Sequence, residues 1–266
     1  VVMIRFDMDA LPVTEETGAV YASSVPGLMH ACGHDGHVAI GLTVAKILQQ
    51  YREQLAGTFK LVFQPGEEGY NGAERMVKEG VLENPKPDYA IGAHVWNEQP
   101  VGWVAASAGP LMAGAGMFTI KITGKGGHGA IPHQAVDPLI AAVQVGSALQ
   151  TIVARNVPPL ESGVLSVTAF KSGEAFNVIP AEAELRGTFR WFSSQVHQTI
   201  TDRMQQLVQS VCVGMGCTAE IELHDLTPAV INDERVAQRI RETMDQSLPE
   251  LQVVTSYQTM GSEDMS

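Results

Sequence analysis

Cysteine, positive charge and long apolar runs are all scarce in this 266-residue sequence. Its three cysteines are odd in number and include no Cys-x-x-Cys pair, which argues against a disulfide framework and against a thiol-redox protein. Sparse cysteine is typical of a reducing compartment, so we expect a cytoplasmic location. No apolar run approaches the ~18 residues that a membrane helix needs, so we expect no membrane association.

The shortage of positive charge excludes two classes of partner. Lys and Arg together number 17 against 29 Asp and Glu, which gives a formal charge of −12. Nucleic-acid phosphates and anionic lipids repel an acidic surface, so neither is an expected partner. Excess carboxylate suits a protein that concentrates cations, although a simple acidic surface gives the same net charge.

The rest of the composition is that of a folded protein with two domains. Hydrophobic residues make up 45% of the chain and charged residues 17%, which is enough apolar material for a sizeable core. The length is well above the roughly 150 residues of an average domain, which favours two domains. The sequence contains no internal repeat and no low-complexity segment.

The first part of the chain shows strand and helix patterns in alternation. Apolar runs at 1–6, 58–63 and 89–95 predict buried strands, and apolar residues at helical spacing predict helices over 37–55 and 72–79. Strands that alternate with helices predict an α/β fold with a mixed, mainly parallel sheet covered on both faces. Ligands of such sheets bind at the carboxyl ends of the strands.

From residue 111 the pattern changes to that of an inserted domain. A strand is followed by a helix that Asp137 caps and Pro138 opens, then by two strands, a second helix and a last strand. The order β-α-β-β-α-β is that of a ferredoxin-like domain. We therefore expect a first domain at 1–110, an inserted domain at 111–224 and a return to the first domain at 225–266. The segments concerned are 118–122, 137–152, 163–170, 183–189, 194–213 and 218–223.

Four clusters of reactive side chains follow the predicted strands of the first domain. Because the carboxyl ends of parallel strands lie at one edge of a sheet, we expect the four clusters to converge there. They are Asp7 with Asp9; Cys32, His34, Asp35 and His37; Glu67 with Glu68; and His94.

Cys32 and His34 form a candidate metal-binding pair on a glycine-containing turn. Thiolate, imidazole and carboxylate are the groups that bind Zn²⁺ and related divalent ions. The same spacing also fits a buried thiol beside a hydrogen-bonded histidine. Glu67 and Glu68 follow an apolar run and a glycine, which favours one carboxylate as ligand and the other as proton carrier over a solvated surface pair.

The other candidates in the first domain have open interpretations. His94 fits either a core histidine or a ligand, and its place at a strand end favours the ligand. Asp7 and Asp9 fit metal ligands, residues that orient a ligating imidazole, or turn residues before Pro12, and we favour the orienting role for at least one of them. His37, at the start of a helix, fits a local structural role as well as ligation.

The inserted domain offers three further candidates. His128 lies on the Gly-rich loop 124–130, either as an exposed residue of a tight turn or as a donor that stabilises negative charge developing on a carbonyl oxygen. Asn177 and Arg190 are candidates for binding a substrate carboxylate, since arginine offers a bidentate fork. Each of these two also fits a purely structural role.

Seven motifs occur in a fixed order along the chain. They are Asp7-Met8-Asp9-Ala10-Leu11-Pro12, Ala31-Cys32-Gly33-His34-Asp35-Gly36-His37, Gln64-Pro65-Gly66-Glu67-Glu68-Gly69, Ala93-His94-Val95, Gly126-Gly127-His128-Gly129-Ala130 with Pro132-His133, Asn177-Val178-Ile179-Pro180 and Gly261-Ser262-Glu263-Asp264. The set closely resembles the amidohydrolase branch of the aminoacylase and carboxypeptidase metallopeptidase superfamily. That branch includes hippurate hydrolases, auxin-conjugate hydrolases and N-acetyldiaminopimelate deacetylases, and the resemblance spans essentially the whole chain.

The resemblance implies a di-metal catalytic domain with an inserted lid domain that also forms a homodimer. It implies hydrolysis of the amide bond of N-acyl amino acids with two divalent metal ions, Zn or Mn, with Co or Ni as further candidates. On matching positions, Cys32 is the bridging thiolate, His34, Glu68 and His94 are further metal ligands, and Glu67 is the general base and acid. The alternatives are a dipeptidase or carboxypeptidase of the same superfamily, or a non-catalytic metal-binding dimerisation module.

The resemblance also extends to the inserted domain and to the end of the chain. His128 matches the lid histidine that assists the oxyanion, commonly across the dimer, and Asn177 and Arg190 match substrate-binding positions. The family's last metal-ligand histidine lies beyond its Ser-Glu-Asp segment, whereas this sequence ends at Ser266. We therefore expect a fragment truncated at both ends, with one metal site incomplete.

Overall fold

The computed structural model describes residues 1–266 and divides into two compact units. The first unit comprises residues 1–108 and 233–256 together with Met265, and the second comprises residues 109–232 and 257–264 together with Ser266. The α/β fold class predicted from the sequence is confirmed, since both units combine helices with sheets.

The first unit is built on a three-stranded parallel sheet. The strands are β1 (Val2–Asp7), β2 (Phe59–Gln64) and β3 (Tyr89–Gly92), and the spatial order is β2-β1-β3. Asp7 at the end of β1 pairs with Gln64 at the end of β2. The carboxyl ends of the strands therefore lie at one edge of the sheet, where parallel sheets carry their sites.

Helix α1 (His34–Gln50) packs against β1 and β2. Its contact depends on Gly41, because a Cβ atom there would lie 2.8 Å from the rings of Phe6 and Phe63. The sequence pattern placed this helix three residues later, from residue 37, because no apolar residue marks its first turn. The earlier start puts His34 and His37 on the same helix, one turn apart.

The remaining elements of the first unit come from both parts of the chain. They are the 3₁₀ turn η1 (Arg52–Gln54), α2 (Gly72–Lys78), α6 (Glu234–Ser247) and the parallel strands β4 (Trp103–Ala105) and β13 (Gln252–Val254). The side chain of Asp233 accepts hydrogen bonds from the backbone N–H groups of Arg235 and Val236, which caps α6.

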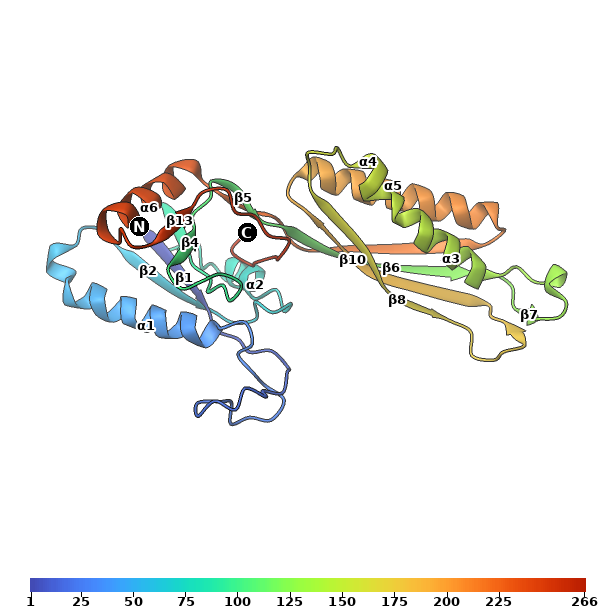
Figure 1. Cartoon of the computed structure of the whole chain (residues 1–266), viewed down its shortest axis with the longest axis horizontal. Helices are drawn as coiled ribbons and strands as arrows, with labels where there is room; N and C mark the ends of the chain where they lie inside the picture. The colour runs from blue at the N-terminus through green and yellow to red at the C-terminus, as the bar shows by residue number, and fades with distance from the viewer. The chain divides into compact units, whose positions relative to one another are not determined.

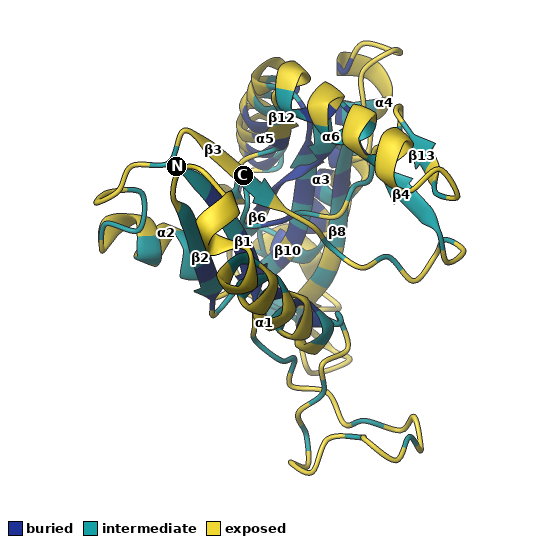
Figure 2. Ribbon diagram, turned by 90° about the vertical axis from the view of Figure 1, so that its left-hand side faces the viewer, coloured by how far each residue is buried: buried dark blue, intermediate teal, exposed yellow.

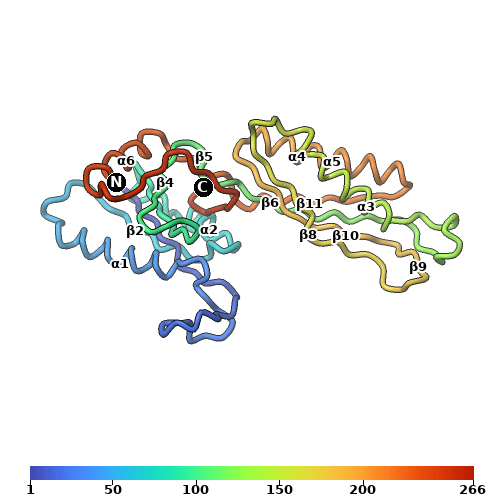
Figure 3. Tube along the Cα trace, viewed as in Figure 1, coloured from blue at the N-terminus to red at the C-terminus, as the bar shows by residue number.

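The second unit is an antiparallel four-stranded sheet with helices on one face (Figures 1 and 3). The spatial order of its strands is β11-β6-β10-β8. In chain order the elements are β6 (Gly114–Thr123), α3 (Pro138–Leu149), α4 (Thr151–Asn156), β8 (Gly163–Ser172), β10 (Glu182–Trp191), α5 (Ser194–Gly214) and β11 (Thr218–Thr227).

The core of the second unit is formed by side chains that alternate between buried and more exposed positions along these strands. Phe118, Ile120 and Ile122 on β6 are fully buried, and they pack with Leu185 and Phe189 on β10 beneath the helices. The buried positions are dark blue in Figure 2. This unit holds the main hydrophobic cluster of the chain.

Short strand pairs and a single 3₁₀ turn complete the second unit. They are β5 (Gly109–Met112) with β12 (Val230–Asn232), β7 (Gly127–His128) with β9 (Val178–Ile179), and η2 (Pro132–Gln134). The single helix predicted over 137–152 is two helices, α3 and α4, and the strand predicted over 218–223 continues to Thr227. None of the helices has both the length and the apolar character needed to cross a membrane.

Candidate metal centre

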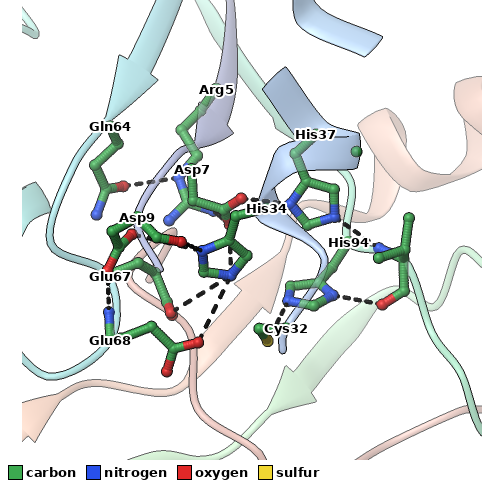
Figure 4. A network of polar contacts seen from close by, with 12 residues as sticks. Arg5, Asp7, Asp9, Cys32, His34, His37, Gln64, Glu67, Glu68 and His94 are labelled. Carbon is green, nitrogen blue, oxygen red and sulfur yellow. Dashed lines mark hydrogen bonds and ion pairs between the residues drawn. The ribbon is translucent and has the colours of Figure 1, made fainter. Parts of the chain in front are cut away.

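Side chains from four segments of the first unit converge at the carboxyl edge of the β2-β1-β3 sheet (Figure 4). Two overlapping groups have ligand atoms within 4.8 Å of one another, and His34 belongs to both. The groups are Cys32, His34 and Glu68, and Asp7, His34, His37 and His94. Four of the residues named as metal ligands from the sequence thus lie in one cluster, with Glu67 beside them.

His34 is fully buried with one ring nitrogen left without a partner. Its Nδ1 contacts the backbone oxygen of Asp9 at 3.1 Å, and because a carbonyl only accepts, Nδ1 carries the proton. Nε2 is buried and makes no hydrogen bond. It lies 3.8 Å from Asp7 Oδ2, 4.0 Å from Glu67 Oε2 and 3.9 Å from Glu68 Oε1. An imidazole lone pair aimed among three carboxylates fits a cation.

His94 presents the same nitrogen in the same way. Its Nδ1 donates a hydrogen bond to the backbone oxygen of Val95 at 2.6 Å, which leaves the lone pair on Nε2. That Nε2 lies 3.4 Å from the Sγ of Cys32. Both histidines therefore have the tautomer in which Nε2 is free to ligate a metal.

Cys32 lies in a strongly negative environment. Burial, followed by the charge and hydrogen bond of Glu68 and the charges of Glu67 and Asp7, raises the pKa of its thiol to about 12. Anionic neighbours destabilise a thiolate unless a positive charge offsets them. The donor set, sulfur, imidazole and carboxylate, is the one expected for a Zn²⁺-type ion, and the surplus of negative charge fits it as well.

The loop after β2 carries the adjacent carboxylates of Glu67 and Glu68, both largely shielded from solvent. Gly66 has a φ of +70°, and a Cβ atom on Gly72 would lie 1.7 Å from a backbone oxygen, so the loop folds tightly on itself. The side chains of Glu67 and Glu68 are only 11% and 19% exposed, which excludes a solvated surface pair. The Oε1 atom of Glu68 is buried without a hydrogen-bond partner.

Asp9 orients two of these groups at once. Its Oδ2 accepts a hydrogen bond from the backbone N–H of Glu68 at 3.0 Å, and its backbone oxygen receives the Nδ1–H of His34. The orienting role favoured from the sequence for at least one of the two aspartates therefore matches the contacts of Asp9. Fixed partners of this kind set the tautomer and direction of a ligating imidazole.

Asp7 belongs to a buried network behind the cluster. Arg5 donates from Nη1 to Asp7 Oδ2 at 2.8 Å and from Nε to Gln64 Oε1 at 2.7 Å, and His37 Nδ1 hydrogen-bonds to Asp7 Oδ1. Burial raises the pKa of the Asp7 carboxyl, but the His37 hydrogen bond and the positive charge of Arg5 outweigh it, so the pKa lies below its usual value.

Sequence reasoning missed Arg5 and Gln64. The available signal was a charged residue inside the apolar run 1–6, which a buried strand tolerates only with a partner.

The candidates of the inserted segment lie in the second unit. His128 on β7 pairs with Val178 on β9, and the N–H of Gly129 donates to the backbone oxygen of Asn177, so His128 and Asn177 are neighbours. The N–H of Ala130 donates to His128 Nδ1 at 3.1 Å, which puts the ring proton on Nε2. His128 thus offers a hydrogen-bond donor at its outer nitrogen.

Arg190 lies apart from these two residues. It stands at the other end of β10 from Glu182, paired with Ala115 and Val164. Its guanidinium donates to the backbone oxygen of Phe189 at 3.0 Å and also contacts the hydroxyl of Thr188, while burial lowers its pKa. Within one chain, Arg190 is not adjacent to His128.

Comparison with known proteins places this chain in a family of peptidases. The family described as Peptidase family M20/M25/M40 matches residues 3–266. The chain belongs to peptidase family M20/M25/M40. The resemblance drawn from the seven sequence motifs is thereby confirmed.

Named relatives of this M20/M25/M40 chain include two curated enzymes. An N-acyl-L-amino acid amidohydrolase of Geobacillus stearothermophilus is 44% identical over 236 residues, which are 88% of this chain and 63% of that protein. A Saccharolobus solfataricus protein named thermostable carboxypeptidase 1 is 37% identical over 268 residues, which are 100% of this chain and 67% of that protein.

A solved structure of the same family has the same fold. It is a Bacillus subtilis protein described as a dinuclear metal binding peptidase of the M20 family, with a TM-score of 0.83 and 35% identity over 99% of this chain and 67% of that one. The M20/M25/M40 chain spans between 60% and 67% of the length of the curated relatives compared with it.

Proposed function

We propose that this M20/M25/M40 chain carries the active site of a metal-dependent amidohydrolase, which cleaves the amide bond of N-acyl amino acids to a carboxylate and a free amino acid. The observation that carries the proposal is the buried Nε2 of His34, unpartnered and directed among the carboxylates of Asp7, Glu67 and Glu68. The amidohydrolase named among the relatives supports the reaction class.

Two divalent ions fit the donor groups of the cluster. Cys32, His34, Glu68 and His94 would hold them, with Zn²⁺ or Mn²⁺ as the first candidates and Co²⁺ or Ni²⁺ as others. When bound, such ions polarise an amide carbonyl and lower the pKa of water. The Bacillus subtilis structure described as dinuclear supports a pair of ions.

Glu67 is the proton carrier of the proposed reaction. Its carboxylate is 11% exposed and lies beside the cluster, 4.0 Å from His34 Nε2. It takes a proton from the attacking water and gives it to the nitrogen of the leaving amino acid. Glu68, whose backbone N–H donates to Asp9, serves as a metal ligand. The two adjacent carboxylates therefore have separate roles, proton transfer for Glu67 and metal binding for Glu68.

The second unit supplies the other proposed roles. We assign residues 111–224 of this unit as a ferredoxin-like lid through which two copies form a homodimer, and the strand order and helices of the unit support that assignment. His128, with its donor Nε2, stabilises the oxyanion, and Asn177 and Arg190 bind the substrate carboxylate. If analytical ultracentrifugation at micromolar concentration gave only the mass of a monomer, the proposed homodimer would be contradicted.

The function is tested by hydrolysis assays on the intact protein. Purified enzyme loaded with Zn²⁺ or Mn²⁺ is given N-acetyl and N-benzoyl amino acids beside dipeptides, and free amino acid is measured. Turnover of the acylated substrates that disappears on chelation and returns with metal is the expected result. Metal binding without cleavage of any of these substrates would instead indicate a non-catalytic metal-binding module.

A carboxypeptidase is the second candidate. It is supported by the thermostable carboxypeptidase of Saccharolobus solfataricus, which aligns with the whole chain. The same panel separates the two candidates, because a carboxypeptidase or dipeptidase cleaves the dipeptides at least as well as the acylated amino acids.

A further inference from the structure

We propose that His37 is a positioning residue, which holds the backbone of Val95 and thereby fixes His94 and the Cys32 turn in place for metal binding. The inference rests on the proposed metal-dependent function of the same site. It assigns a role to a histidine that the spacing of the sequence left open between ligation and local structure.

The ring of His37 has no nitrogen left for a metal. Its side chain is only 2% exposed. The N–H of Val95 donates to Nε2 at 2.9 Å, and because a backbone N–H only donates, Nε2 carries no proton. The proton is therefore on Nδ1, which donates to Asp7 Oδ1. Although His37 lies within ligand distance of the cluster, both its nitrogens are engaged by protein.

The ring is held rigidly from the strand side. Asp7 uses one carboxylate oxygen for His37 and the other for Arg5, which in turn donates to Gln64. All four residues are buried, so water does not compete for these hydrogen bonds. The imidazole of His37 on α1 is therefore held in a fixed position relative to β1 and β2.

Val95 connects His37 to His94 and to the turn at Gly33. Its N–H is held by His37, and its backbone oxygen accepts the Nδ1–H of His94. Its Cγ2 atom approaches Gly33 so closely that a Cβ atom there would lie 2.6 Å away. Gly33, with a φ of +84°, forms the turn between Cys32 and His34.

The rings of His37 and His94 are also in direct contact. Their centroids are 4.7 Å apart with an interplanar angle of 77°, an edge-to-face arrangement. Loss of the bond between His37 and Val95 would release the segment after β3, and with it the Nε2 of His94 that faces the Cys32 thiol. Residues that orient a metal ligand typically contribute about 10- to 100-fold to metal affinity.

Two amide substitutions at His37 separate its hydrogen bond with Val95 from its hydrogen bond with Asp7. In His37→Gln the side-chain oxygen reaches the position of Nε2 and keeps an acceptor for the Val95 N–H. In His37→Asn the amide reaches only the position of Nδ1, so it keeps the bond to Asp7 and leaves the Val95 N–H without an acceptor. A role limited to local stability predicts no difference in Zn²⁺ affinity between the two folded variants.

The experiment measures Zn²⁺ affinity of the intact protein by chelator competition, with the Co²⁺ absorption spectrum as a report on ligand geometry. We expect His37→Gln to stay close to wild type, and His37→Asn to lose about 10- to 100-fold in affinity with a changed Co²⁺ spectrum. Equal affinities for the two variants overturn the proposal. The hydrolysis assays decide the function separately, since a wild type that binds Zn²⁺ but cleaves nothing leaves this comparison intact.

A measurement on the unsubstituted protein guards against variants that fail to fold. The ¹⁵N chemical shifts of the His37 ring report which nitrogen carries the proton. The structure requires protonated Nδ1 and unprotonated Nε2, both before and after Zn²⁺ is added. A shift of Nε2 on Zn²⁺ binding, as for a coordinated nitrogen, would contradict the positioning role. A wild type that binds no Zn²⁺ overturns both this role and the proposed function.

Discussion

At the scale of single residues, the chemistry of the site depends on which atoms are left without a protein partner. His34 and His94 each give the Nδ1 proton to a backbone oxygen and keep Nε2 free, whereas His37 commits both nitrogens. Three histidines that look alike in the sequence therefore differ in whether a ring nitrogen is free of protein hydrogen bonds. The distinction follows from hydrogen-bond partners and not from spacing.

Glu67→Gln is expected to bind metal normally and to lose activity. The amide keeps the shape of the side chain but takes no proton from water, and loss of a general base typically costs about 10²- to 10⁴-fold in kcat. The measurement is kcat on an N-acyl amino acid together with metal content by elemental analysis. The matched control is Glu74→Gln, an exposed helix residue paired with Lys78, which should leave kcat unchanged. A normal kcat in Glu67→Gln would refute the assignment of the base.

The Cys32 thiol makes metal affinity depend on pH. With its pKa raised to about 12 in the metal-free site, the group is protonated at neutral pH, and binding as a thiolate releases that proton. Apparent Zn²⁺ affinity should therefore rise by about tenfold per pH unit from this group alone, and fall as the pH falls.

The test of this pH dependence compares wild type with Cys32→Ser by chelator competition at several pH values. Cys32→Ser should bind Zn²⁺ more weakly and show a slope smaller by about one proton per ion. The same slope in both proteins would show that this sulfur is not a ligand. Cys212→Ser, a substitution in the second unit, is the control for loss of a thiol elsewhere.

At the scale of elements, the helix and strand pattern was predictable and the ends of the segments were not. The runs at 1–6 and 58–63 correspond to β1 and β2, because a buried parallel strand is a short apolar run. Helix α1 begins three residues before the predicted start, since its first turn carries site residues in place of apolar ones. Tertiary contacts, rather than periodicity, decide such boundaries.

Two glycines of α1 form a matched pair for testing this packing. Gly41→Ala places a Cβ atom 2.8 Å from the rings of Phe6 and Phe63, so the helix must move from the sheet, at a typical cost of about 1–3 kcal/mol. Gly36→Ala meets no atom within 4 Å, and alanine favours a helix over glycine by up to about 1 kcal/mol. In urea unfolding, the free energy of unfolding should fall in Gly41→Ala and rise in Gly36→Ala. A Gly41→Ala protein as stable as Gly36→Ala would contradict the close contact.

At the scale of the whole molecule, stability is divided between two kinds of core. The second unit contains the main cluster of buried apolar side chains, whereas the buried set of the first unit includes Arg5, Asp7, His34, His37 and Gln64. Buried polar and charged groups stabilise a fold only when they are paired, and the cluster at the sheet edge gathers several carboxylates. The first unit should therefore depend on metal more than the second.

Calorimetry of the intact protein should show this difference as two thermal transitions. Zn²⁺ at about 100 times its Kd stabilises the unit that binds it by ~2.7 kcal/mol, and the proposed ligands all lie in the first unit. Chelation should lower the temperature of one transition and leave the other unchanged. Equal shifts of both transitions would show that the two units unfold together. Glu74→Gln protein should behave as wild type in the same scans.

The sequence by itself determined the α/β class, the family and the identity of the reactive side chains, because periodicity and ordered motifs are properties of neighbouring residues. The tertiary structure decided how those side chains are used. Arg5 meets Gln64 59 positions away, and the N–H of Val95 meets His37 58 positions away. Contacts between such distant segments fix which nitrogen holds a proton and which carboxylate is shielded from water, and no local pattern records them.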